Sequence, residues 1–65
     1  MTSKGIAQRL IAKYGKRIAR TLASERRYRA SEALNTATQY ADVAHASGRL
    51  TLWTIVNVHI DRIEA

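Results

Sequence analysis

The sequence predicts an all-α protein, a small bundle of two to three helices. Its 65 residues contain no proline and only three glycines, so few residues interrupt a helix. Apolar residues recur at spacings of three and four along most of the chain, which is the period of an amphipathic helix. We therefore expect a single helical domain over residues 1–65, with a long or kinked basic helix followed by an antiparallel C-terminal helix.

The first predicted helix begins near Thr2 or Ser3, either of which can cap its N-terminus. Its apolar side chains fall within one arc of about 160° on a helical wheel. They are Ile6, Leu10, Ile11, Tyr14, Ile18 and Leu22. Because this face keeps its phase across Gly15, we expect an uninterrupted helix there. The alternatives are a C-cap at Gly15 or a helix-turn-helix DNA reader with its turn at this glycine.

The second predicted helix has its apolar face in a different direction. Its apolar positions are rotated by more than about 90° from those of the first helix on the same wheel. They are Ala30, Ala33, Leu34, Ala37, Ala41 and Ala44. This change of phase indicates a kink or a tight junction between Leu22 and Ala30. The alternative is one long helix that has a different neighbour on each face.

A turn at Gly48 is expected to separate the second helix from a third. Gly48 would end the second helix as its C′ residue, and Thr51 would cap a third helix over residues 52–64. The short connection at 47–50 would make these two helices antiparallel neighbours. β-Branched residues are dense after Thr51, so a strand is the alternative, although a lone strand has no sheet to join.

The chain is short for an independent monomer. A protein of this length buries only about 60% of the surface that its unfolded chain exposes. It has no cysteine, which excludes disulfide bonds and thiolate metal sites, and its two histidines are too few for a zinc site. We predict no metal and no cofactor. The fold is therefore expected to be completed by oligomerisation or by a partner.

The sequence also predicts a soluble, cytoplasmic protein. The N-terminus "MTSKGIAQRL" has neither the apolar core nor the cleavage site of a secretory signal. The most apolar run, "LTLWTIVNVHI", has 11 residues, whereas a membrane-spanning helix needs roughly 20. We therefore expect no transmembrane segment.

Positive charge is concentrated in the first half of the chain. Residues 1–31 contain nine Lys or Arg against one acid, a net charge of +8, whereas residues 32–65 carry a net charge of −2. Such asymmetry indicates an anionic partner, which could be a nucleic acid, a lipid surface or an acidic protein surface. Solubility alone is the simpler explanation of a basic composition.

The basic side chains are the candidate binding site. Several of them would share the side of the first helix that lies opposite its apolar face. The residues predicted to contact a nucleic acid or an acidic partner are Arg9, Lys13, Lys16, Arg17, Arg20, Arg26, Arg27 and Arg29. Arginine presents five donors in a planar fork that suits phosphates and carboxylates. We assign Tyr28, which lies among these arginines, to packing rather than to base stacking.

We expect no catalytic activity and assign no catalytic residue. The one pair that could do chemistry is Asp42 with His45, and no nucleophile or phosphate-binding loop accompanies it. We therefore predict a non-enzymatic basic helical protein that binds nucleic acid. The alternative is a small inhibitor or assembly factor, of the kind found as phage or plasmid accessory proteins, that docks on a larger protein complex.

Overall fold

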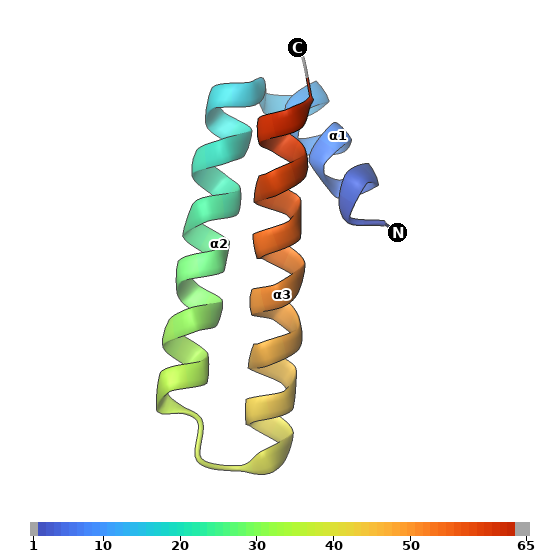
Figure 1. Cartoon of the computed structure of the whole chain (residues 1–65). Coiled ribbons are helices and arrows are strands. Elements are labelled where there is room, and N and C mark those ends of the chain that lie inside the picture. The colour runs from blue at the N-terminus through green and yellow to red at the C-terminus, as the bar shows by residue number, and fades with distance from the viewer. Residues whose placement is uncertain (1, 64–65) are drawn as a thin grey trace.

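The computed structural model describes residues 2–63, which form three α-helices (Figure 1). The helices are α1 (Ser3–Tyr14), α2 (Lys16–Thr36) and α3 (Tyr40–Arg62). The long helices α2 and α3 form an antiparallel hairpin, and α1 lies beside the end where α2 begins and α3 finishes (Figure 1). The all-α prediction is confirmed for these residues, and the apolar run after Thr51 is helix rather than strand.

One residue, Gly15, separates α1 from α2. Its backbone has φ 84° and ψ 159°, a region that essentially only glycine occupies without strain. Its N–H donates to the Ile11 carbonyl at 2.8 Å, and its own carbonyl accepts from the N–H of Ala19 at 2.9 Å. The uninterrupted helix expected across Gly15 is therefore wrong. Gly15 ends one helix and begins the next, although the apolar residues keep their spacing across it.

Helix α2 is continuous where a kink was expected. No residue between Leu22 and Ala30 leaves the helix. Its buried residues are Ala19, Ala23 and Ala30, whose spacings of four and seven keep them on one side of the helix. The helix can therefore stay in contact with α3 along its length without bending, and the predicted junction is wrong.

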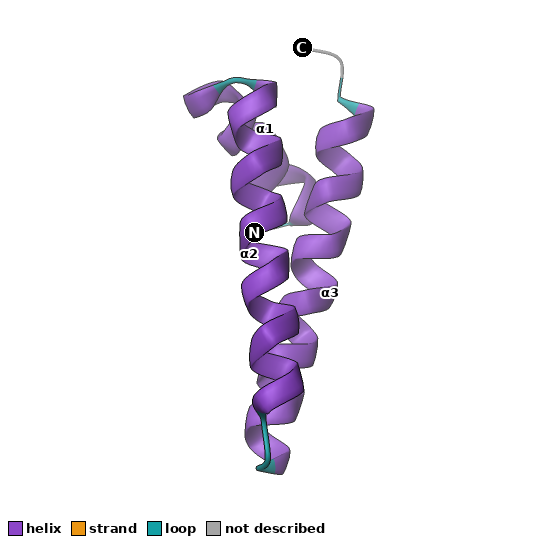
Figure 2. Cartoon of the chain, turned by 90° about the vertical axis from the view of Figure 1, so that its left-hand side faces the viewer, coloured by secondary structure: helices purple, strands orange, loops and turns teal. Residues whose placement is uncertain are grey.

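The turn between α2 and α3 lies at residues 37–39, as the lower teal connection in Figure 2 shows. Near the end of α2, the Thr36 hydroxyl donates to the carbonyls of Glu32 (3.1 Å) and Ala33 (3.3 Å). Gly48 lies inside α3, so the predicted helix end at Gly48 and the new start at Thr51 are wrong. A glycine inside a helix costs only about 1 kcal/mol relative to alanine, which the neighbouring turns can offset. The C-terminal helix is antiparallel to the helix before it, as expected, but the turn lies about ten residues earlier. Residues 40–47 and 52–62, which were expected to face each other across a turn, belong to the same helix α3.

The hydrophobic core lies at the end of the hairpin that α1 covers. Small alanines of α1 and α2 (Ala7, Ala19 and Ala23) pack there against the bulky Trp53, Val56 and Ile60 of α3. Alanine lets the helix axes approach, and the large side chains of α3 fill the space between them. Beyond this cluster, the buried residues of the hairpin are Ala30 and Ala46. The described helices include none with the length and apolar character needed to cross a membrane.

Candidate nucleic-acid interface

The eight predicted contact residues do not form one stripe. Gly15 turns the chain between Lys13 on α1 and Lys16 on α2, so the row expected along one helix is split between two. On α2, the arginines point to both sides of the hairpin, because consecutive residues of a helix are 100° apart. The structure therefore places the basic residues in three separate settings, and the single stripe is wrong.

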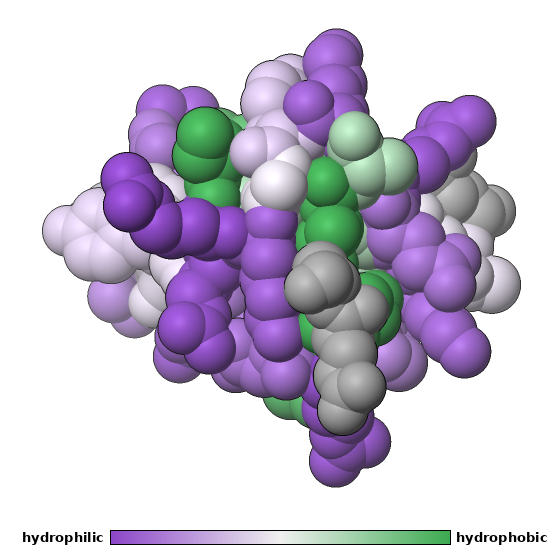
Figure 3. Space-filling view, turned by 90° about the horizontal axis from the view of Figure 1, so that it is seen from above, coloured by the Kyte–Doolittle hydropathy of each residue, from purple (hydrophilic) through white to green (hydrophobic). Residues whose placement is uncertain are grey.

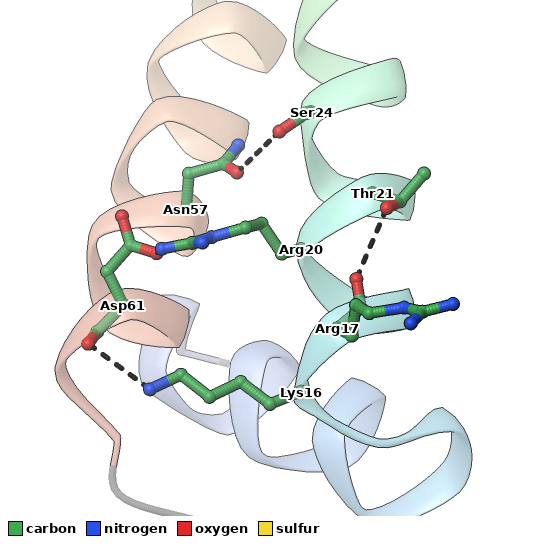
Figure 4. Close-up of polar contacts among 7 residues, drawn as sticks. All are labelled: Lys16, Arg17, Arg20, Thr21, Ser24, Asn57 and Asp61. Carbon is green, nitrogen blue, oxygen red and sulfur yellow. Dashed lines mark hydrogen bonds and ion pairs between the residues drawn. The ribbon is translucent and has the colours of Figure 1, made fainter.

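The first setting joins α2 to the C-terminal end of α3 (Figure 4). Arg20 forms an ion pair with Asp61, and its Nε donates to the Asp61 carboxylate at 2.8 Å. The Lys16 Nζ lies 3.4 Å from the Asp61 main-chain oxygen. One turn further along, the Ser24 hydroxyl donates to the side-chain oxygen of Asn57 at 3.1 Å. These exposed contacts link the two helices, so Lys16 and Arg20 have partners within the fold as well as contributing to its charge.

The second setting is the exposed surface of α1 and of one side of α2. Arg9 and Lys13 are exposed on α1, and Lys13 lies over the ring of its neighbour Tyr14 at 5.2 Å. Arg17 points away from α3 in Figure 4. In Figure 3, hydrophilic side chains project on all sides of the three-helix end, with hydrophobic surface visible between them.

Arg27 is also exposed on α2, and it lines a hollow of about 410 Å³ between α2 and α3. The other residues that line this hollow are Ser24, Tyr28, Ser31, Leu50 and Thr54. Tyr28 is 65% exposed, so the packing role assigned to it is at most partial.

The third setting is a groove between the lower halves of α2 and α3, with a volume of about 540 Å³. Arg26 and Arg29 line it from α2, and Arg49 lines it from α3. Arg49 was not among the predicted contact residues. It is brought there because the turn at 37–39 places its part of α3 beside the arginines of α2. The spacing of Asp42, His45 and Arg49 along one helix face is the signal that could have identified it.

The groove combines a basic rim with a floor of small side chains. Its floor and walls include Ala30, Ala33, Ala37 and Ala46, together with the hydroxyls of Thr36 and Thr38. Among the residues lining it, the three arginines outnumber the single acid, Asp42. The groove therefore has a positive formal charge of +2 when His45 is neutral.

Both groove arginines of α2 have a partner within the chain. Arg29 pairs with Glu25, one helical turn away, at 2.6 Å, and its side chain remains 71% exposed. An ion pair this exposed contributes little to stability, so a phosphate can compete for Arg29. The guanidinium of Arg26 lies over the Trp53 ring at 5.4 Å from its centre, which leaves its N–H groups free to bind an anion.

The groove lies on the same faces of α2 and α3 as the hydrophobic core, further towards the turn. Its α2 residues follow Ala19 and Ala23 at helical spacing, and its α3 residues precede Trp53 and Val56 in the same way. Helix α1 covers the upper part of these faces with Ile6, Leu10 and Ile11. Below α1, the alanines leave the space between α2 and α3 unfilled, and the groove is this unfilled part.

Asp42 and His45 line the wall of the groove rather than a separate pocket. Within residues 2–63, no cluster of three or more His, Cys, Asp or Glu side chains could hold a metal ion. Comparison of the chain with protein-family models, with curated proteins and with solved structures found no match.

Proposed function

We propose that the protein is a non-enzymatic nucleic-acid-binding protein whose phosphate contacts centre on the groove between α2 and α3. The observation that carries this proposal is the meeting of Arg26, Arg29 and Arg49, from two helices, around one open groove. A guanidinium can hold two phosphate oxygens at once, and neighbouring arginines can hold successive phosphates. Such contacts give binding that depends little on base sequence and strongly on salt.

Arg17 and Arg27 are exposed on α2 outside the groove and would add phosphate contacts to it. From Arg17 to Arg29 the helix advances by 12 positions, which corresponds to about 18 Å. Duplex DNA carries one charge for about every 1.7 Å of its axis, so an 18 Å helix lies beside several phosphates. Long-range attraction by the whole chain, with its net charge of +6, would speed the encounter.

The test is the salt dependence of binding to labelled duplex and single-stranded oligonucleotides, measured by fluorescence anisotropy. We expect detectable binding at low salt and a steep loss of affinity as salt increases. Arg49→Gln should reduce the slope of log affinity against log salt by about 0.9 on duplex DNA, the value of one phosphate contact. Arg62→Gln is the matched control, because it removes the same charge outside the groove.

Two results would contradict the proposal. The first is no binding to either form of nucleic acid at low salt. The second is equal slopes for the wild type, Arg49→Gln and Arg62→Gln, because this would show that net charge alone is responsible.

The second candidate function is that of a small protein-binding inhibitor or assembly factor. The alanine floor of the groove favours it, because Ala30, Ala33 and Ala37 offer an apolar surface to the side chains of a partner helix. The rim arginines would then pair with acidic residues of that partner. This candidate predicts no binding to oligonucleotides at low salt. It also predicts that the protein is retained on a larger complex from its native host. Arg49→Gln should abolish this retention, whereas Arg62→Gln should not.

A further inference from the structure

The side of α3 that faces away from the core has no charged residue for about five helical turns. We call it the outer face, and it consists of Tyr40, Ala44, Ser47, Gly48, Thr51, Ile55 and Val58. All seven residues are exposed, including 89% of Tyr40, 41% of Ile55 and 43% of Val58. In a chain of which 25% is charged, so long an uncharged surface needs an explanation.

Helix α3 is apolar on two opposite sides. One side supplies Trp53, Val56 and Ile60 to the core, and the other exposes Ile55 and Val58 to solvent. A helix that contacts its own fold on one side usually has polar residues on the other, whereas a helix that is apolar all round is covered all round. The outer face therefore has the composition of a contact surface.

Gly48 gives a second and independent reason. It lies in the middle of the 23-residue helix α3, where glycine is less favourable than alanine. Its φ is not positive, and a Cβ built on it would meet nothing within 4 Å. Neither the backbone conformation nor the packing of the single chain therefore requires a glycine here. Close approach of another backbone is the remaining reason for a glycine at position 48.

We propose that the outer face of α3 packs against the outer face of a second copy, with the two helices antiparallel and closest at Gly48. A two-fold axis midway between Gly48 and Thr51 places Ile55 of one copy over Ala44 of the other. It also places Gly48 opposite Thr51. Large side chains then lie over small ones, with the smallest residue at the centre, which is the complementarity that close helix packing needs.

The charges favour a second copy over a different partner. An acidic partner would be attracted to the arginines of α2, and the outer face offers it nothing to pair with. The self-pairing instead brings together two uncharged surfaces of a chain with a net charge of +6. It keeps both copies of α2 on the far sides of the pair, more than one Debye length of about 10 Å apart.

The size of the outer face sets the expected strength of the pairing. From Tyr40 to Val58 it is about 27 Å long, the contact of a single helix pair. Stable dimers bury about 800 Å² on each partner, and one helix pair of this length buries less. We therefore expect a reversible dimer with a dissociation constant in the micromolar range.

The test is sedimentation equilibrium of the full chain from micromolar to millimolar concentration, without nucleic acid. We expect the apparent mass to increase from 7.3 kDa towards twice this value. Gly48→Leu and Thr51→Lys should each weaken the dimer at least about tenfold, the first by separating the backbones and the second by placing two charges in the contact. Asn35→Lys is the control, because it adds the same charge at an exposed position of α2.

The helix content and melting temperature of each variant, measured by circular dichroism in dilute solution, separate loss of pairing from loss of folding. Gly48→Ala is the second variant, since alanine favours helix and should stabilise the monomer while it weakens the dimer. A mass of 7.3 kDa at millimolar concentration would overturn the proposal. A dimer unaffected by Gly48→Leu and Thr51→Lys would overturn it too. The inference does not depend on nucleic-acid binding, which can succeed or fail separately.

Discussion

The guanidinium of Arg26 lies 5.4 Å from the centre of the Trp53 ring. This contact joins the two parts of the hairpin, because Trp53 belongs to the core and Arg26 lines the groove. Trp53 is the single tryptophan of the chain, and its indole Nε1 is buried with no hydrogen-bond partner in the described structure. Trp53 therefore contacts both the hydrophobic core and a residue that lines the groove.

Trp53→Ala should destabilise the protein far more than Trp53→Phe. Loss of a large buried aromatic side chain costs about 3–5 kcal/mol, whereas phenylalanine keeps most of the aromatic volume and leaves a smaller cavity than alanine. The phenylalanine variant also removes an N–H group that is buried without a partner. Urea denaturation followed by circular dichroism measures both changes. Equal losses in the two variants would contradict the assignment of Trp53 to the core.

Gly15→Ala should destabilise the protein by about 1–3 kcal/mol, because an L side chain is strained at the backbone angles of Gly15. The Cβ itself would meet no other atom, so the penalty comes from the backbone alone. Gly48→Ala in dilute solution is the matched control and should stabilise the monomer by about 0.5–1 kcal/mol. The same substitution should therefore change the free energy of unfolding in opposite directions at the two glycines. A stabilising Gly15→Ala would show that α1 and α2 are one helix.

Arg20 and Asp61 should be coupled by only about 0.2–1 kcal/mol. Their side chains are 60% and 51% exposed, and solvent screens a pair of this kind. Asp61 also lies near the C-terminal end of α3, where the helix dipole disfavours an acid, so Asp61→Asn alone should change stability little. A double-mutant cycle with Arg20→Gln and Asp61→Asn measures the coupling. The coupling should disappear in about 1 M salt, where the Debye length is about 3 Å.

Ala33→Leu should fill part of the groove without removing a charge. Ala33 is exposed on the groove wall, so the change in stability should stay within about 0.5 kcal/mol. If phosphates lie in the groove, oligonucleotide affinity should decrease several-fold, whereas Ala41→Leu, at an exposed position that does not line the groove, should have no effect. An unchanged affinity in Ala33→Leu would place the nucleic acid elsewhere on α2.

The sequence predicted the helical class, a cap at Thr2 or Ser3 and an antiparallel C-terminal helix, because these follow from local spacing and capping. Thr2 accepts a hydrogen bond from the N–H of Gly5 at 3.0 Å, as an N-cap should. The helix boundaries were mispredicted for a physical reason. Gly15 ends a helix and Gly48 does not: Gly15 has a positive φ, whereas Gly48 keeps a negative φ within α3. The turn at 37–39 contains neither glycine nor proline, so no strong local signal marks it.

The candidate site was predictable in composition but not in arrangement. Arg26 and Arg29 were identified from local charge alone, and the structure confirms that both are exposed. Arg49 was missed because its meeting with them depends on where the hairpin turns. A turn at Gly48 would have placed Arg49 in a loop, whereas the turn at 37–39 places it on a helix opposite α2.

The limited cover given by α1 implies that the hairpin does not have the same stability along its length. At the covered end, Ala19, Val56 and Ile60 are fully buried, whereas towards the turn the buried side chains are only alanines. Few apolar contacts oppose opening there, so the last turn of α2 and the first turn of α3 should separate transiently while the core remains intact. Amide hydrogens near the turn should then exchange with solvent fastest, and a protease would cut the chain there first.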